Sequence, residues 1–432
     1  MSILEKIFKI SERQSSIKQE IIGGIATFVA MSYIIFVNPS VLSSTGMDKN
    51  ALITVTCIAT AIGTLLVAFF ANMPIVLAPA MGLNTFFAFS IVQGQGVSWE
   101  IALGVVFLSG FFYLLLTLTG IRKQIASAIP IPISLAASVG IGLFITFIGL
   151  RGMNIIVANP ATLVALGDFN PKVALSLFCL FLMVLFDVKK VQGGMLFSII
   201  ITTVIGIISG MIEVPTKFIS LLPPSIAPIA MKLDILGAFK WSLAGAIFSF
   251  LFIDLFNSLA FVIACCKQLG LEESDGRIKN INQMLYADSI ATLAGACMGT
   301  STISTFSEST VGITAGAKTG FASVITALLF ILALFFTPIV TIVPLFIAAP
   351  ALVIVGVYMF KNIVHMDFSN MKTAIPSFLT IVLMPLSYNI VIGLSFGFIS
   401  YIIMHIIDND FKKISPVLWI IGILSVIFLF IA

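Results

Sequence analysis

The sequence predicts an all-α polytopic membrane protein that crosses the bilayer about fourteen times. Its 432 residues are 59% hydrophobic and only 9% charged, whereas an ordinary soluble domain is roughly 25% charged. Long stretches carry no Asp, Glu, Lys or Arg, namely residues 21–47, 50–99, 101–121, 124–150, 319–360 and 414–432. Because a helix needs about 20 apolar residues to cross the hydrocarbon, the two longest stretches each hold two spans.

The basic residues orient these spans. We expect spans near residues 21–42, 51–72, 75–93, 99–119, 127–150, 173–186, 193–212, 241–266, 283–299, 305–317, 320–342, 343–360, 374–387 and 390–407. With the N-terminus inside, sixteen of the 22 lysines and arginines lie in inner segments and six in outer segments. Since cytoplasmic loops carry the excess of Lys and Arg, we predict a multi-pass protein of the cell (inner or plasma) membrane with a cytoplasmic N-terminus.

Two segments lie outside these spans. Residues 1–20 form a mixed-charge cytoplasmic lead without the apolar core and cleavage site of a signal peptide. Residues 416–432 are a further apolar segment that either crosses the membrane or lies against its neighbours. The five cysteines lack metal-ligand spacing, so we expect no metal site and no disulfide framework. The net charge of +4 sits in the loops between spans and indicates no nucleic-acid partner.

The order of the spans predicts a seven-plus-seven inverted repeat. Seven spans precede a proline-rich outer connection at 213–240 and seven follow it, and an odd number per repeat inverts the second copy. The third span, PIVLAPAMGLNTFF, contains Pro79 and Gly82, and the tenth is entered through GTSTISTFSESTVG. Proline removes a backbone donor and glycine weakens a helix. We therefore expect both spans to be broken by short extended stretches that are buried or line a cavity.

The spacing of polar residues fits this repeat. Glu308 follows Asp254 by 54 residues, and the residue 54 before Asn84 is Ala30, in the middle of the first span. Polar groups on the two broken spans therefore stand at matching places in the two halves.

Asp254 is the first candidate site residue. It lies in the apolar stretch from Trp241 to Cys266, and a carboxylate at the bilayer centre costs on the order of 2.5–3.5 kcal/mol. It is therefore expected to face the protein interior or a wet cavity, as a substrate ligand or as a buried structural acid. Asn257 lies one helical turn later, where its amide would bind substrate or join helices.

Glu308 is the second candidate, because it begins the tenth span. We expect its carboxylate to accept hydrogen bonds from exposed backbone N–H groups at the positive end of that helix. Asp254 and Glu308 would then bind the N–H donors of a planar heterocycle, while Ser307 and Asn84 satisfy its acceptors.

Two further residues complete the candidate set. Asp288, nearer the inner end of the ninth span, is either a proton-relay group or a supporting acid. Phe306 flanks the broken backbone, where it would stack on a flat ring or simply pack in the core. The sequence has no zinc-protease pair, phosphate-binding glycine loop or nucleophile elbow, which argues against an enzyme or an ATP-driven pump.

Four motifs, in order along the chain, resemble a known family. They are TFVAMSYIIFVNPSVL, PIVLAPAMGLNTFF, LFIDLFNSLAF and ADSIATLAGACMGTSTISTFSESTVG. They are similar to the AzgA-like purine permeases of the nucleobase–ascorbate (xanthine/uracil permease) transporters, up to about residue 410. This chain departs from that family's usual pattern by having Asn257 at a second acid position, Ala80 at a glycine position, and the pair Ser309-Thr310.

The resemblance implies proton-coupled uptake of hypoxanthine, guanine or adenine, commonly by a homodimer, with no cofactor beyond the coupling proton. By motif position, Asp254 and Glu308 match acids that bind the base, Asp288 the ninth-span acid and Asn84 the third-span asparagine. We assign proton coupling to Asp254 and Asp288. The resemblance also implies a core domain at residues 21–120 and 238–342 and a gate domain at residues 121–237 and 343–410. Residues 1–20 are then the N-terminal lead, and residues 411–432 are the C-terminal segment.

Two other readings stay open from the sequence. The chain could carry another nucleobase, such as uracil or xanthine, or act as an uncoupled facilitator. It could also be a transport-inactive sensor or scaffold, since Asn257 replaces an acid beside the predicted site. Retention of Asp254 and Glu308 argues against this last reading, because intramembrane acids without function are costly.

Overall fold

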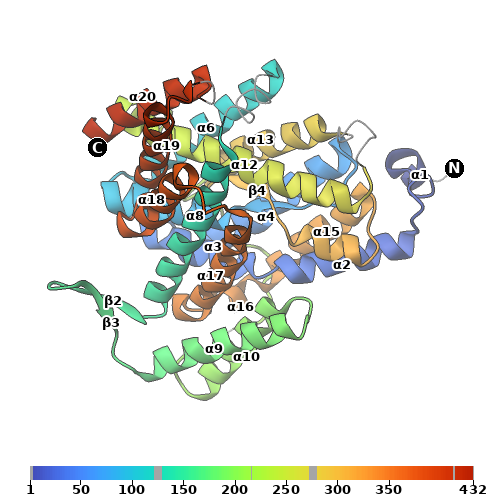
Figure 1. Ribbon diagram of the computed structural model, residues 1–432. Helices are drawn as coiled ribbons and strands as arrows, with labels where there is room; N and C mark the ends of the chain where they lie inside the picture. Colours follow the sequence, from blue (N-terminus) through green and yellow to red (C-terminus); the bar gives the residue numbers. More distant parts are fainter. Residues whose placement is uncertain (1–2, 121–128, 216, 272–279, 412–413, 432) are drawn as a thin grey trace.

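The computed structural model describes residues 3–120, 129–215, 217–271, 280–411 and 414–431 (Figure 1). The first two residues of the predicted fifth span lie outside this described part. So do six of the inner basic residues that set the predicted topology, namely Arg122, Lys123, Arg277, Lys279, Lys412 and Lys413.

Nine helices in the described part of the chain are long and apolar enough to cross a membrane. They are the first span, which combines α2 (Ile17–Met31) with α3 (Ile34–Leu42), together with α4 (Lys49–Phe70), α6 (Trp99–Thr119), α8 (Ile131–Gly152), α9 (Pro171–Val188), α12 (Ala244–Gln268), α15 (Gly320–Ala333) with its extension α16 (Thr337–Thr341), α17 (Leu345–Phe360) and α19 (Ile390–Ile407). Shorter apolar helices are α10 (Gly194–Ile208), α18 (Met371–Leu386) and α20 (Pro416–Ile431), and α13 (Ile281–Met298) is a less apolar helix of 18 residues. The predicted mostly helical, multi-span fold is confirmed.

The third and tenth spans are broken as predicted. The third consists of strand β1 (Leu77–Pro79), the short helix α5 (Met81–Thr85) and a π-helical segment at Phe86–Gly94. The tenth consists of strand β4 (Ile303–Thr305) and helix α14 (Ser309–Thr314). The two strands pair antiparallel, with Leu77 opposite Thr305 and Pro79 opposite Ile303. Each half of the chain therefore contributes one extended stretch to a crossing inside the helices.

The Ser/Thr-rich sequence around the crossing satisfies its backbone. Val76 N–H donates to Ser309 Oγ at 3.0 Å, and Thr292 Oγ1 donates to the carbonyl of Ile303 at 2.8 Å. Beyond the ladder, Ala80 N–H donates to the carbonyl of Thr302 at 2.9 Å. Buried backbone groups need such partners, because no water reaches them at membrane depth.

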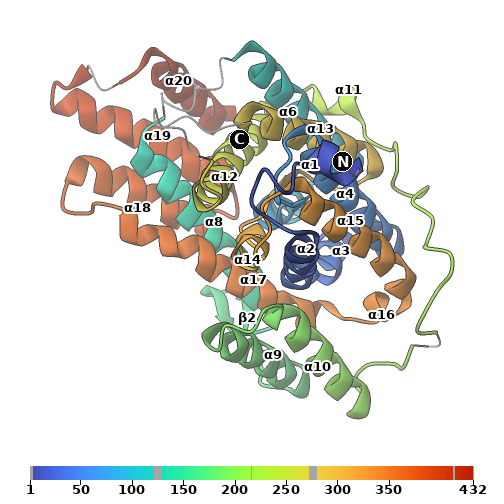
Figure 2. The same cartoon turned by 90° about the vertical axis from the view of Figure 1, so that its right-hand side faces the viewer.

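The helices pack in two neighbourhoods, as Figure 2 shows. Helix α8 packs on α17, α18 and α19, while α9 packs on α10 and α17. On the other side α4 packs on α13 and α15, α2 on α14 and α15, and α6 on α12 and α13. Glycines allow the closest approaches: a Cβ on Gly142 would lie 2.8 Å from the carbonyl oxygen of Gly356. Such small-residue contacts are typical of helix packing in membranes.

A β-hairpin between α8 and α9 was not predicted. Strands β2 (Ile156–Asn159) and β3 (Leu163–Leu166) pair antiparallel and extend away from the helices (Figure 1). The turn is made by Asn159, whose Oδ1 accepts from the backbone N–H groups of Ala161 and Thr162. Asparagine favours this local turn over continued regular structure.

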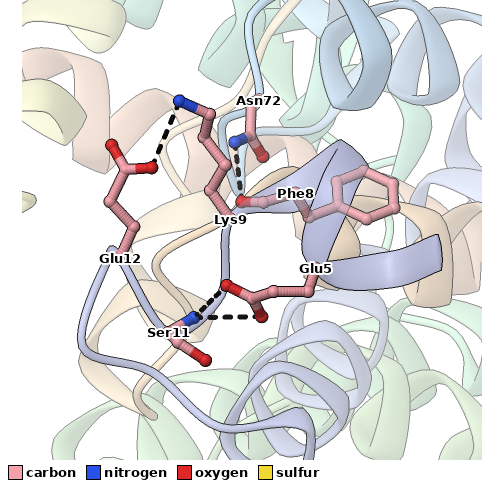
Figure 3. A network of polar contacts seen from close by, with 6 residues as sticks. All are labelled: Glu5, Phe8, Lys9, Ser11, Glu12 and Asn72. Atoms are coloured by element: carbon pink, nitrogen blue, oxygen red, sulfur yellow. Dashed lines mark hydrogen bonds and ion pairs between the residues drawn. The ribbon is translucent and has the colours of Figure 1, made fainter. Parts of the chain in front are cut away.

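The N-terminal lead is folded onto the helix ends (Figure 3). Helix α1 (Ile3–Phe8) is followed by a turn in which Glu5 accepts from Ser11 N–H and Lys9 pairs with Glu12 at 3.1 Å. Asn72 Nδ2, just after α4, donates to the carbonyl of Phe8 at 2.8 Å. Phe8 is buried, so the lead is anchored to the end of α4 by an apolar contact and a hydrogen bond.

Two other segments form helices that pack against the spans. A four-residue helix, α11 (Ile235–Ala238), lies in the proline-rich connection and packs on α6. At the end of the chain α20 packs on α19, and a Cβ on Gly245 of α12 would lie 2.4 Å from the ring of Phe428. The described part of the predicted apolar segment, Pro416–Ile431, is thus a helix in contact with its neighbours.

Candidate functional site

A cavity of about 410 Å³ lies beside the broken tenth span. One wall is formed by Ala30 of α2 and by residues between Ser307 and Thr314 on α14 and just before it. The opposite wall is formed by Met183 and Asp187 of α9, by the turn from Lys190 to Met195, and by Tyr358 of α17. An open cavity of this size, with polar and charged side chains on both walls, is large enough for a small molecule.

Glu308 is the acid of the first wall. The Tyr33 hydroxyl donates to its Oε1 at 2.9 Å, and the Ser307 hydroxyl donates to its Oε2 at 3.0 Å. Each oxygen of the carboxylate thus accepts one hydroxyl donor and keeps further lone pairs for a ligand. The structure therefore brings Ser307 and Glu308 together at the cavity, as the sequence predicted.

The predicted donors to Glu308 are wrong, however. Glu308 precedes α14 but makes no side-chain cap hydrogen bond, and its own backbone is already helical, with φ −60° and ψ −17°. A capping side chain ordinarily sits on a residue with extended backbone, from which it reaches the N–H groups of the first turn. Hydroxyls from Tyr33 and Ser307 take the place of the expected backbone donors.

A second acid lines the opposite wall. Asp187 Oδ1 accepts from the Tyr358 hydroxyl at 2.6 Å, and Lys190 lies three residues further along the chain. Sequence analysis did not single out these residues. Their signal was weak, because an acid and a base at the end of a membrane helix are common at the interface.

Asp254 lies on a neighbouring helix and does not line this cavity in the described part of the chain. It is buried, with 2% of its surface exposed, and its helix α12 packs against both β4 and α14. Ser258, one turn later, contacts Ser304 of β4 through their hydroxyl oxygens at 2.9 Å. Asn257 is only half-buried on the same helix.

Asn84 is fully buried behind the crossing. Its Nδ2 donates to Asn38 Oδ1 at 2.6 Å, and Asn38 Nδ2 donates to Thr56 Oγ1 at 2.7 Å. This network joins the first, second and third spans. The structure therefore gives the Asn84 amide a partner within the protein, at a distance from the cavity lining.

Asp288 and Phe306 occupy buried positions. Asp288 of α13 accepts from the Tyr113 hydroxyl at 3.0 Å and is fully buried. Phe306 follows β4, with 8% of its surface exposed, and its N–H extends the strand pairing to the carbonyl of Val76. Of the predicted site residues, Ser307 and Glu308 line the cavity, and the other five are not among its lining residues.

Family membership follows from comparison with known proteins. A model of the permease family Xan_ur_permease, the xanthine/uracil permeases, matches residues 18–396. The chain belongs to this family. The match covers both broken spans and every predicted site residue, and it identifies the protein as a permease and not an enzyme.

Relatives of this permease match over nearly their whole length. A protein of Methanocaldococcus jannaschii is 43% identical, with 99% of this chain and 98% of its own covered. The guanine/hypoxanthine permease PbuG of Bacillus subtilis is 39% identical, with coverage of 99% and 100%. The adenine permease AdeP of Escherichia coli is 37% identical, with coverage of 98% and 95%.

Solved structures place the permease in a known fold. The transmembrane domain of the cyanobacterial bicarbonate transporter BicA superposes with a TM-score of 0.65 at 15% identity, covering 87% of this chain and 97% of that one. Murine Slc26a9 in the inward-facing state superposes with a TM-score of 0.64 at 11% identity, covering 94% and 72%. At these identities the likeness concerns the fold, and it confirms the seven-plus-seven inverted repeat.

Ala30 links the repeat to the site of the permease. The spacing along the chain pairs Ala30 in the first half with Asp254 in the second. The structure places Ala30 in the cavity wall, so its small side chain leaves open space where a larger one would project.

Among the described residues no group of three or more His, Cys, Asp or Glu side chains is placed to hold a metal ion.

Proposed function

We propose that this permease is a secondary active transporter that takes up a purine nucleobase, hypoxanthine, guanine or adenine, together with a proton. The observation that carries the proposal is Glu308, a carboxylate held by two hydroxyls at the wall of the cavity beside the broken tenth span. Relatives named for adenine and for guanine/hypoxanthine, 37% and 39% identical over their full length, support the substrate class.

The chemistry of the cavity suits a purine. A purine base is flat and uncharged and presents N–H donors at its edges, which a carboxylate accepts well. Glu308 would accept from that edge, and Ser307 would complete the contact. Phe306, next to Ser307 in the chain, would stack on the ring when the site rearranges around the base. Asp254, Asn84 and Asn257 surround the crossing and would contact the base in the same rearrangement.

Proton coupling is assigned to Asp254 and Asp288. Both carboxyl groups are buried on helices next to the broken spans. A buried acid changes its proton affinity when water or a hydrogen-bond donor reaches it, so its titration can follow the opening of the site. Binding of the proton and of the base would then be linked, each favouring the other by the same factor.

The motion is proposed to be an elevator-like or rocking movement of core against gate. The core comprises residues 21–120 and 238–342, and the gate comprises residues 121–237 and 343–410. The cavity supports this division, because Ala30 and the Ser307–Thr314 wall belong to the core, whereas Asp187, Lys190 and Tyr358 belong to the gate. A relative movement would carry Glu308 along the wall that holds Asp187. The predicted topology places the turn at Lys190 on the cytoplasmic side.

Replacement of Glu308 by Gln tests the proposal. The variant keeps the size of the side chain but loses the charge that the N–H donors require, so purine binding should fall at least about a hundredfold. The measurement is equilibrium binding of labelled purine to purified protein. Glu100→Gln, at the start of α6 and outside the cavity, is the matched control. Near-normal affinity of Glu308→Gln would remove Glu308 from the site.

A further inference from the structure

The first span is interrupted beside the cavity. Helix α2 ends at Met31 and α3 begins at Ile34, with Ser32 and Tyr33 between them. The chain stays hydrogen-bonded here, since Ser32 N–H donates to the carbonyl of Phe28 and Val37 N–H donates to the carbonyl of Tyr33. The interruption comes directly after Ala30 and Met31, and Ala30 lines the cavity.

The side chain of Tyr33, in this interruption, contacts the tenth span. Its side chain is buried, with 1% exposed, and its hydroxyl donates to Glu308 Oε1 at 2.9 Å, across 275 residues of sequence. Tyr33 is absent from the residues that line the cavity, whereas Glu308 is among them. Tyr33 therefore contacts the acid without forming part of the described cavity wall.

We propose that Tyr33 is a positioning residue of the substrate site, which acts through Glu308. This inference rests on the proposed function, because it takes Glu308 as the ligand of the base. The phenol holds one carboxylate oxygen and Ser307 holds the other, so the plane of the carboxylate is fixed before the base arrives. The lone pairs that these hydroxyls leave free are then directed into the cavity.

The energetic role follows from preorganisation. A carboxylate that can rotate must be ordered when the base binds, and that ordering weakens affinity. The Tyr33 side chain is itself immobile, because it is buried and because α3 packs against α4 and α17. A site group whose own rotamer is locked by packing and a supporting hydrogen bond holds its geometry better than one exposed to water.

Tyr33→Phe tests the inference, since it removes only the hydroxyl. We expect the KM for purine uptake to rise about tenfold, the usual scale for a lost hydrogen bond to a charged group. The maximal rate should stay within about twofold, because the saturated site is ordered in both proteins. Tyr388→Phe is the matched control: its hydroxyl accepts from Arg151 at 3.1 Å, outside the cavity, and its KM should equal that of the wild type.

A double-variant cycle separates positioning from a structural role. Glu308→Asp shortens the acid by one methylene and withdraws it from Tyr33, so adding Tyr33→Phe should change the KM no further. A wild-type KM for Tyr33→Phe would overturn the inference, as would an undiminished additional rise in the Glu308→Asp background. If Glu308→Gln and Glu308→Asp both bind purine normally, the proposed site itself fails. If only Glu308 variants lose binding, the proposed site stands and the role of Tyr33 fails.

Discussion

At the residue scale, several acids of this permease accept a hydrogen bond from a tyrosine hydroxyl. Tyr33 donates to Glu308 and Tyr113 donates to Asp288, while Tyr358 makes the same contact with Asp187 at the exposed end of α9. A phenol is well suited to this task, because its ring is apolar and its hydroxyl is a donor. A carboxylate can then be buried beside the broken spans with its hydrogen-bonding capacity partly used and partly available.

Asp254→Asn tests the proposed coupling. The change removes the titrating proton but keeps the shape of the side chain, so we expect purine binding and exchange to persist. Accumulation driven by an inward proton gradient should be lost, because the variant can no longer link proton binding to base binding. The measurement is the uptake of labelled purine into vesicles with an imposed pH gradient, compared with exchange at equal pH.

Asn257→Asp provides the companion variant. It restores the acid that the family usually has at this position, and we expect it to steepen the pH dependence of uptake. If Asp254→Asn still accumulates purine and remains sensitive to a protonophore, coupling does not reside at Asp254. Asp288 is then the next residue to replace.

At the element scale, the cavity depends on very close packing of the broken tenth span. Helix α14 contacts α2 through two glycines: a Cβ on Gly312 would lie 2.6 Å from the carbonyl oxygen of Gly23 and closer still to Thr27 Oγ1. A Cβ on Gly23 would in turn lie 2.5 Å from the Cβ of Ala317. This contact sets the position of Glu308, which immediately precedes α14.

Gly312→Ala is therefore expected to destabilise the protein by about 1–3 kcal/mol, the usual range for overpacking a core. The melting temperature of the purified protein should fall, and purine affinity should fall with it because α14 must shift. Gly46→Ala is the control for purine affinity: its φ of +92° strains an alanine and lowers stability, but its Cβ would have no atom within 4 Å, so purine affinity should not change. Equal melting temperatures for Gly312→Ala and the wild type would show that the contact between α14 and α2 is not close enough to exclude a methyl group.

Sequence analysis anticipated the elements whose cause is local. Pro79 cannot continue a helix, and the Ser/Thr run before Glu308 favours extended backbone, so the breaks in the third and tenth spans could be predicted. The break at Ser32–Tyr33 could not, because no proline or glycine marks it and its backbone stays helical. Nor could the donors to Glu308, since Tyr33 reaches it across 275 residues.

At the scale of the whole molecule, polar contacts join segments that the predicted topology places on one side. Lys318 Nζ donates to the carbonyl of Gln14 at 3.1 Å, and Glu20 accepts from the backbone N–H groups of Lys318 and Thr319. Lys372 forms an ion pair with Asp408. These contacts fit the predicted grouping of segments on one side of the membrane. The cytoplasmic location of the N-terminus stays a prediction, as does assembly into a dimer.

Cysteine labelling tests this topology. A cysteine at Ser11, an exposed position in the N-terminal lead, should escape an impermeant thiol reagent in intact cells and react after permeabilisation. A cysteine at Ala161, in the exposed hairpin turn between β2 and β3, should react without permeabilisation. The native cysteines add little background, because four of the five are buried. Labelling of Ser11→Cys in intact cells would contradict the predicted cytoplasmic N-terminus.

Uptake of labelled nucleobases into cells that lack their own carriers tests the central claim most directly. Hypoxanthine, guanine, adenine, uracil and xanthine are each supplied with and without a protonophore, and Glu308→Gln serves as the inactive control. The account predicts that at least one of hypoxanthine, guanine and adenine accumulates above its external concentration, and that the protonophore abolishes the accumulation. Accumulation of uracil or xanthine alone, or purine uptake that the protonophore leaves unchanged, would contradict it.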